Sequence, residues 1–424
     1  MSVRELMRGF LPVLLSFASV HLILQTDLLV VARLGTLETA AWSVPQRLAV
    51  LDTVLLMALS AVSSVVVARA RPAQRARVVR GVLTVALGVG VATALLGLTL
   101  YPWLARELVA EAAVGELAAA ALLWFALAAP FRHLAAVALM ALHALGEGPR
   151  IVRWKLTEVA LNAGLDLLCV YALHAGFVGV FQSSGVVAAL GCLWALQRLW
   201  RRLGPARAPR RAWLCGFLGQ CRWELKRMAS AQLSALAVML LFANVGDPAQ
   251  QLPRFAAYAA GTALGLLLFM PCLALLRFLA FRLGALPGGQ ALAAVQGLHR
   301  TLLPWTLAAA AALYLGGDWL GRTLYGLDGV WWSALVSLLA LALPLRYLGA
   351  LQRALLQAQR QFAAVTRVDT ALSWGLGLPL VAAGLYLEQP WLTFAYLLLP
   401  ELGVVLWLQC HIRRSRQAVP LPAC

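Results

Sequence analysis

Apolar runs long enough to cross a membrane alternate with short polar segments along the 424-residue chain. A spanning α-helix needs about 20 mostly apolar residues, because each residue advances it by about 1.5 Å and the hydrocarbon core is about 30 Å thick. The runs predict twelve spans, near residues 10–33, 40–68, 81–104, 117–145, 156–175, 177–197, 228–246, 254–281, 301–319, 330–350, 368–387 and 391–411. This pattern predicts an all-α polytopic membrane protein.

The composition supports this prediction and excludes a soluble domain. Hydrophobic residues make up 62% of the chain and charged residues only 12%, whereas soluble domains contain about 25% charged residues. The first apolar run follows a basic segment, as in a signal peptide, but it is too long and contains an aspartate. We therefore expect it to be a retained span.

The net charge of +18 would also suit a nucleic-acid-binding protein, but its distribution indicates a membrane protein. If the N-terminus is cytoplasmic, the predicted cytoplasmic segments contain 28 of the 35 basic residues, and the opposite loops contain acidic residues instead. This is the positive-inside pattern. We expect both termini in the cytoplasm, a plasma-membrane location (the inner membrane in a Gram-negative bacterium), the lipid bilayer as a partner and no nucleic acid.

The cysteines and histidines give no sign of a metal centre or of disulfides. All seven cysteines fall in predicted spans or cytoplasmic segments, where disulfides are rare. The sequence contains no Cys/His spacing typical of a metal site. We expect no cofactor and no enzymatic activity.

The composition of the chain changes once, in residues 198–227, which are rich in arginine and proline. This segment predicts a basic cytoplasmic linker between an N-terminal lobe, residues 1–197, and a C-terminal lobe, residues 228–424. Six spans in each lobe would make the two lobes run in the same direction, as parallel repeats do. We expect two pseudo-symmetric lobes around a central cavity. Aligning the first and seventh spans places Val238 opposite Asp27, which predicts a cation site in the first lobe only.

Four polar residues in the predicted spans are candidates for that site. Asp27 lies in the first span, Asn162 and Asp166 in the fifth, and Ser184 in the sixth. A carboxylate in a membrane helix costs about 2.5–3.5 kcal/mol on insertion scales, so a retained one suggests a function. Asn162 and Asp166 share a helix face, because they are four residues apart. Counting helix rise from the outer end of each span puts the acids and the serine about 9–12 Å deep.

Two carboxylates, an amide and a hydroxyl at one depth can form an oxygen-lined pocket. Such a pocket suits Na⁺ at Asp27, Asn162 and Asp166. The two carboxylates could instead share a proton. A purely structural role as polar contacts between helices is the simpler alternative.

Other polar or special residues in the spans are weaker candidates. Pro12 would bend the first span by removing a helix hydrogen bond, which predicts a conformational switch that moves Asp27. Asp52, Arg132 and Glu401 are candidates for a substrate cavity, because charged residues are rare inside membranes. Packing between helices is the alternative for each of them.

The residues of the first, fifth and sixth spans resemble the multidrug and toxic compound extrusion (MATE) family, within the multidrug/oligosaccharidyl-lipid/polysaccharide exporter superfamily. The first span of that family carries a proline, an aspartate about fifteen residues later and a closing G-R-L-G. The fifth span often reads L-N-x-x-L-D and the sixth pairs a glycine with a hydroxyl. The matching residues here are Pro12, Asp27, Arg33, Leu34, Gly35, Ala40, Ala41, Asn162, Asp166, Gly179 and Ser184.

The resemblance covers residues 10–190 well and the second half only in general layout. Two positions depart from the family pattern: Ala32 replaces a glycine, and Ile23 stands where a tyrosine is often found. The acidic residue that other subfamilies carry in the seventh span is also missing. The resemblance implies that Asp27, Asn162, Asp166 and Ser184 form a cation site in the N-terminal lobe.

From the residues and the resemblance together we expect a monomeric secondary active exporter. It would expel a small organic compound, such as a drug, toxin or secondary metabolite, in exchange for H⁺ or Na⁺. The main alternative is a flippase for lipid-linked oligosaccharide or polysaccharide precursors, which would need a basic cavity. A major-facilitator transporter, a membrane-embedded transferase and a non-transporting scaffold fit less well, because their expected loops are absent or because both carboxylates are retained.

Overall fold

The structure, a computed structural model, describes residues 3–108, 111–205, 209–245, 248–286 and 288–417. These residues are almost entirely helical and contain no strand. The chain ends, for which a cytoplasmic location is predicted, and residues 206–208 of the predicted linker lie outside this part. The long helices of the first half are α1 (Val3–Ala32), α2 (Thr36–Arg69), α3 (Arg75–Leu108), α4 (Ala112–Leu127), α5 (Ala129–Ala144), α6 (Gly148–Leu167) and α7 (Gly176–Leu203).

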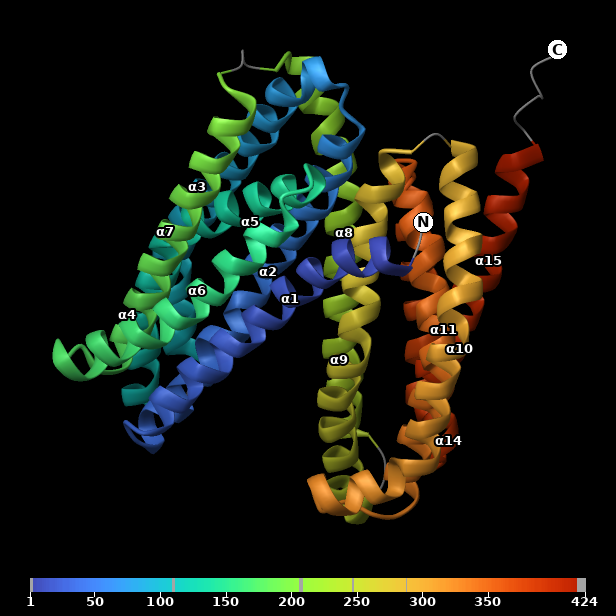
Figure 1. The fold of residues 1–424 in the computed structure, drawn as a ribbon. Coiled ribbons are helices and arrows are strands. Elements are labelled where there is room, and N and C mark those ends of the chain that lie inside the picture. Colours follow the sequence, from blue (N-terminus) through green and yellow to red (C-terminus); the bar gives the residue numbers. More distant parts are fainter. Residues whose placement is uncertain (1–2, 109–110, 206–208, 246–247, 287, 418–424) are drawn as a thin grey trace. The chain divides into compact units, whose positions relative to one another are not determined.

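The second half continues with eight more helices (Figure 1). They are α8 (Arg211–Asn244), α9 (Pro248–Gly284), α10 (Gly288–Leu320), α11 (Val330–Ala358), α12 (Phe362–Leu372), α13 (Leu378–Tyr386), α14 (Pro390–Phe394) and α15 (Leu399–Gln417). The chain forms two compact units, Arg8–Leu225 and Lys226–Cys424 together with Met1–Met7. Much of the segment expected to be a linker, 198–227, is helical, since it contains the end of α7 and the first half of α8.

Nine helical segments within the described residues are long and apolar enough to cross a membrane, and the bent pair α4 and α5 makes a tenth. The two remaining predicted spans, 156–175 and 301–319, overlap α6 and α10. The N-terminal half of α6 carries several charged residues, which lower its hydropathy. The structure is therefore that of a multi-pass helical membrane protein and is compatible with the twelve predicted spans.

The fourth predicted span, 117–145, is broken in the structure, because α4 and α5 meet at an angle of 48°. Pro130 is the second residue of α5 and has no N–H to donate, so one helix hydrogen bond is missing at this point. Helix α3 packs closely against the break at Gly90, where a Cβ would lie 2.7 Å from Pro130 Cα.

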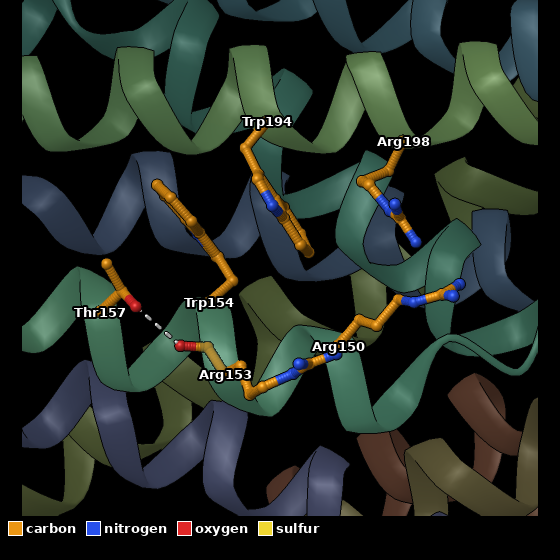
Figure 2. Close-up of a pocket in the computed structure, with 6 residues that line it drawn as sticks. All are labelled: Arg150, Arg153, Trp154, Thr157, Trp194 and Arg198. Carbon is orange, nitrogen blue, oxygen red and sulfur yellow. Dashed lines mark hydrogen bonds between the residues drawn. The ribbon is translucent and has the colours of Figure 1, made fainter.

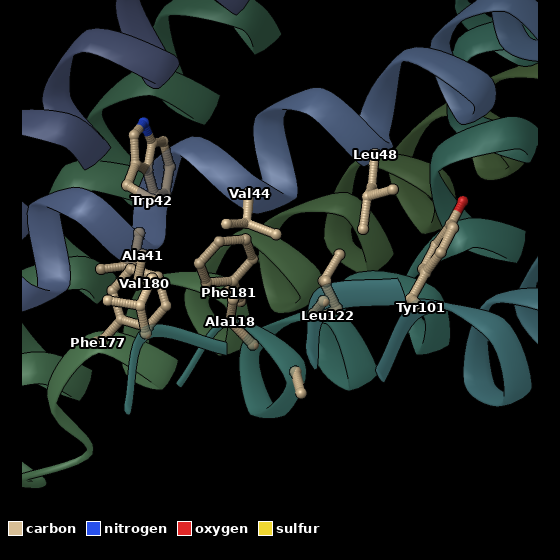
Figure 3. Close-up of a cluster of buried hydrophobic side chains, with 14 of the residues drawn as sticks. Ala41, Trp42, Val44, Leu48, Tyr101, Ala118, Leu122, Phe177, Val180 and Phe181 are labelled. Atoms are coloured by element: carbon tan, nitrogen blue, oxygen red, sulfur yellow. The ribbon is translucent and has the colours of Figure 1, made fainter. Parts of the chain in front are cut away.

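The core of the first unit joins α2, α4 and α7 (Figure 3). Trp42 of α2 packs on Phe181 of α7 with ring centroids 5.4 Å apart, and Phe177 packs edge-on against Phe181. Small residues of α4, such as Ala118, are fully buried beside these rings. This packing fixes α7 and with it the serines that follow Phe181.

A separate core holds the second unit together. Phe242 of α8 stacks on Tyr258 of α9 and on Phe394 of α14. Trp332 of α11 is buried and donates its indole N–H to Gly317 O of α10 over 2.9 Å. Val238, the counterpart of Asp27 in the sequence alignment, is buried in this apolar core.

Candidate cation site and other polar clusters

Three helices of the first unit bring the predicted cation-site residues into one cluster. The Asn162 amide of α6 donates to Asp27 Oδ1 of α1 over 2.6 Å and to Asp166 Oδ2 over 2.9 Å. The Ser184 hydroxyl of α7 lies 3.5 Å from Asp27 Oδ2 and 3.3 Å from Asn162 Oδ1. The four residues therefore form a connected set of oxygens around one amide nitrogen.

The cluster also contains Ser183, which the sequence analysis did not select. Its hydroxyl donates to Asp166 Oδ1, and the side chain is completely buried, whereas Ser184 is partly exposed. The only signal in the sequence is that the two serines are adjacent. Which of them faces Asp166 depends on the rotation of α7, since neighbouring residues are about 100° apart around a helix.

The local backbone explains how α7 reaches the carboxylates. The helix after Asp166 widens into a π-helical turn, Leu168–Ala172. A Cβ at Gly179 of α7 would lie 3.1 Å from the carbonyl carbon of Cys169 and 3.2 Å from Ala175 Cβ. The missing side chain at this position allows α7 to pack closely against the end of α6.

The two carboxylates are buried and have no basic partner among the residues that the structure describes. The exposed fraction is 3% for Asp27 and 0% for Asp166, and the hydrogen-bond partners are neutral amides and hydroxyls. Two unpaired negative charges in such surroundings are strongly unfavourable. The arrangement therefore favours binding of a proton or of a small cation.

The oxygen atoms of the cluster are the kind of ligand that a hard cation prefers, and not the kind that a transition metal prefers. Among the described residues, no group of three or more His, Cys, Asp and Glu side chains could hold a metal ion. Carboxylate, amide and hydroxyl oxygens are the ligands that hard cations prefer.

Pro12 lies within an uninterrupted α1. The Ser16 hydroxyl donates to Pro12 O over 2.8 Å and lies 3.2 Å from His143 Nε2 of α5. A Cβ at Gly148 of α6 would lie 3.1 Å from the proline ring. The proline thus packs against the start of α6, close to the end of α5. Helix α6 also carries Asn162 and Asp166 of the cation cluster.

The structure pairs two of the substrate candidates with each other. Arg132 of α5 donates to Asp52 Oδ2 of α2 over 3.1 Å and 2.9 Å, and to Phe125 O over 2.6 Å. The guanidinium also lies 3.8 Å above the Phe125 ring. His133 Nδ1 lies 3.7 Å from Asp52 Oδ1. Neither candidate contacts the Asp27 cluster through a described hydrogen bond.

Glu401 of α15 belongs to a second charged cluster, in the second unit. Its carboxylate accepts a hydrogen bond from Arg353 Nη1 over 2.6 Å, and Arg346 Nε lies 3.8 Å away. Arg353 also donates to Asp369. A Cβ at Gly349 would collide with both Glu401 and Arg353, so the glycine makes room for this ion pair.

Comparisons with known proteins agree with the sequence motifs. The MatE family model matches residues 12–168. No curated protein sequence matches the chain at a significant level. Among solved structures, the Vibrio cholerae MATE transporter VcmN in the bent form has a TM-score of 0.85 at 18% identity, with 98% of each chain covered.

Two further structures match at similar levels. A multidrug resistance MATE family transporter in an outward-facing conformation has a TM-score of 0.81 at 18% identity, covering 96% of this chain and 95% of its own. A MOP superfamily transporter from Pyrococcus furiosus, for which a reversed polarity of the binding pocket suggests a different function, has a TM-score of 0.80 at 16% identity, covering 97% and 94%. The resemblance predicted from the sequence is confirmed: residues 12–168 match the MatE family model, and nearly the whole chain has the fold of MATE transporters.

Proposed function

We propose that this protein is a secondary active exporter that expels a small organic compound in exchange for H⁺ or Na⁺. One observation carries the proposal. Three helices bury two carboxylates that have no basic partner among the described residues, and one amide, that of Asn162, donates a hydrogen bond to each of them. Asp27, Asn162, Asp166 and Ser184 would bind the coupling ion, and Ser183 would orient Asp166. The substrate would enter from the cytoplasm and leave on the outer side.

Ion binding would be coupled to transport through α1. A proton or cation at Asp27 removes the repulsion between the carboxylates and changes how firmly α1 is held against α6 and α7. Pro12 leaves the carbonyl of Arg8 without its helix hydrogen bond, so α1 bends most easily there. MATE proteins of similar fold have been crystallised in straight and in bent conformations, which supports this step. Linkage requires that the ion and the substrate change each other's affinity by the same factor.

The test is transport of fluorescent organic cations in proteoliposomes under an imposed pH or Na⁺ gradient. Asp27→Asn and Asp166→Asn each remove one negative charge with almost no change in shape. We expect gradient-driven transport to fall at least about tenfold in both variants, the change that a loss of about 1.4 kcal/mol produces. Asp318→Asn, the same change at an exposed position of α10, is the control and should transport as the wild type does. Unchanged coupled transport in both site variants would contradict the proposal.

The alternative, a flippase for lipid-linked oligosaccharide precursors, requires a basic cavity for the diphosphate of its substrate. The charged candidates for a cavity form pairs of opposite sign, Asp52 with Arg132 and Glu401 with Arg353. This mixture favours a small organic compound. Competition of a lipid diphosphate with the organic cation in the same assay would favour the flippase instead.

A further inference from the structure

A basic cleft of about 300 Å³ lies between α6 and α7, outside the cation cluster. Its lining residues are Arg150, Arg153, Trp154 and Thr157 of α6 and Trp194 and Arg198 of α7. Figure 2 shows the two indole rings between the helices and Arg198 extending from α7 toward α6. All six residues lie within the end of α6 or α7 that the charge distribution assigns to the cytoplasmic side.

The cleft has more positive than negative charge. Arg150, Arg198 and Arg202 all pair with one carboxylate, that of Glu147. Arg153 is exposed and has no ion pair among the described residues. Three guanidinium groups therefore share one carboxylate and a fourth, that of Arg153, has no counter-charge, so the four arginines exceed the single carboxylate by three positive charges. An anion is the ligand that this excess would attract.

An apolar groove of about 470 Å³ continues from the cleft along the same two helices. It is lined by Trp154, Leu161, Leu190, Leu193, Trp194 and Gln197. The two tryptophans border both the groove and the cleft and stack with their ring centroids 5.2 Å apart. A Cβ at Gly191 would lie 3.5 Å from the Trp154 ring, an ordinary contact distance, so this indole packs directly against α7.

The dimensions of the groove fit one leaflet of a bilayer. Eight residues separate Arg198 from Leu190 on α7, which corresponds to about 12 Å along the helix, and eleven residues separate Arg150 from Leu161 on α6, about 16 Å. Half of the hydrocarbon core is about 15 Å. Leu193 is 64% exposed on this surface, as expected for a lipid-facing side chain. Tryptophans at the boundary between the basic and the apolar part match their usual interfacial position.

We propose that the cleft and the groove together bind one anionic glycerophospholipid, with its phosphate on Arg150, Arg153 and Arg198 and an acyl chain along Leu190 and Leu193. The basic cleft alone would suit any phosphate, but only a lipid also uses the apolar groove. The site is separate from the cation cluster and does not depend on the proposed transport activity.

The test is lipid binding to the detergent-purified full-length protein, measured by native mass spectrometry. The two probes are phosphatidylglycerol, whose headgroup has a net negative charge, and phosphatidylcholine, whose choline group neutralises the phosphate; both have the same acyl chains. We expect phosphatidylglycerol to bind more tightly. Arg153→Gln should weaken its binding about fivefold, which corresponds to the loss of about 1 kcal/mol per basic residue near anionic lipid.

Arg201→Gln provides a matched control, because Arg201 is an exposed arginine of α7 that does not line the cleft. It should change the binding of phosphatidylglycerol less than twofold. Arg198→Gln is the second cleft variant and leaves Glu147 two arginine partners. Leu193→Gln should weaken both lipids, and sn-glycerol 3-phosphate, which has the headgroup phosphate without acyl chains, should not displace the lipid at equal concentration. Equal losses in the cleft and control variants, equal binding of the two lipids, or displacement by glycerol phosphate would each overturn the proposal.

Discussion

The buried residue Glu401 shows how a charged side chain is tolerated within a membrane helix. Its two oxygens lie 2.6 Å and 3.3 Å from Arg353, which is in turn bonded to Asp369. Removing one member of a buried ion pair leaves the other charge without compensation, at a cost of about 3–5 kcal/mol. The cluster is therefore expected to stabilise the fold of the second unit.

Because Arg353 keeps Asp369 as a partner, we predict that Glu401→Gln lowers the unfolding free energy by about 1.5–3 kcal/mol, the contribution of a hydrogen bond to a charged group. The melting temperature of the detergent-purified protein should fall as well. Glu116→Gln provides a comparison, because Glu116 and its partner Arg106 both have exposed side chains. That variant should melt at the temperature of the wild type, since exposed ion pairs contribute little. A Glu401→Gln variant as stable as Glu116→Gln would show that the cluster has no stabilising role.

Single residues were predicted from the sequence to different degrees. Asp27, Asn162, Asp166 and Ser184 could be selected because polar groups within apolar runs are costly and because they match a family pattern. The partners of the other charged candidates, Asp52 and Glu401, were harder to predict. Asp52 and Arg132 are 80 residues apart in the chain, and Glu401 and Arg353 are 48 apart. Hydrophobic periodicity does not determine which faces of such distant helices meet.

At the scale of single helices, apolar run length predicts where a span lies but not whether it is continuous. The fourth span is broken at Pro130, and the eleventh consists of α12, a π-helical turn and α13. The π-helical turn keeps Phe362–Tyr386 one continuous segment, and neither feature shows in the length of its apolar run. Position within the run alone therefore cannot distinguish a proline that begins a new helix from one that a long helix tolerates, such as Pro12 in α1.

The close contact between α3 and the break can be tested at Gly90. A Cβ there would lie 2.7 Å from Pro130 Cα and 3.2 Å from Ala129 O, which are backbone atoms that cannot rotate away. We predict that Gly90→Ala destabilises the protein by about 1–3 kcal/mol through overpacking. Gly88, two residues earlier on the same helix, has open space around it. Gly88→Ala should be neutral or stabilising by up to about 1 kcal/mol, because alanine favours a helix.

Thermal unfolding of the two alanine variants in the same detergent measures this difference. The comparison removes the effect of helix propensity, since both substitutions are Gly→Ala in α3. Equal melting temperatures would contradict the close packing at the α4–α5 break.

The connection from α5 to α6 depends on Glu147, which accepts hydrogen bonds from arginines of both α6 and α7. Burial raises the pKa of this carboxyl, but the hydrogen bonds from Arg150, Arg198 and Arg202 outweigh it and hold the pKa below the ordinary value of 4.5. A carboxyl with a lowered pKa in the folded state stabilises that state fully above the unfolded pKa. This contribution is lost as the pH falls through the folded pKa.

We therefore predict that the stability difference between the wild type and Glu147→Gln is largest near neutral pH and shrinks below about pH 4.5. Melting temperatures of both proteins between pH 7 and pH 3.5 measure this difference, and other titrating groups cancel in the comparison. Glu111→Gln changes an exposed glutamate at the start of α4 and should follow the wild type at every pH. A difference that grows as the pH falls would have the wrong sign for this role of Glu147.

At the scale of the whole molecule, the amount and placement of apolar sequence were enough to predict the helical membrane fold. Ten of the twelve predicted spans meet the criteria of length and hydropathy in the described residues, and the other two overlap α6 and α10. The α6 helix is less apolar because it carries two arginines of the basic cleft, Arg150 and Arg153, and two polar residues of the cation cluster, Asn162 and Asp166. The charged and polar residues of α6 therefore lower the hydropathy from which a span is predicted.

The charges of the chain predict its orientation in the membrane, and this orientation can be tested. The segment 346–367 is basic and is expected in the cytoplasm, whereas Glu388 and its neighbours are expected outside. Gln359 and Gln389 are exposed residues in the turns at the two ends of the α12–α13 span. If the α12–α13 segment crosses the membrane once, the two turns lie on opposite faces.

In a cysteine-free variant that still folds, we expect Gln389→Cys to react with a membrane-impermeant maleimide in intact cells. Gln359→Cys should react only after the membrane is permeabilised, because the positive-inside rule places its basic surroundings in the cytoplasm. The reverse pattern would mean that the orientation is opposite to the predicted one, and it would contradict the proposed direction of export. Reaction of both cysteines from one side would mean that α12 and α13 form a re-entrant hairpin, which their combined length of 25 residues and apolar character argue against.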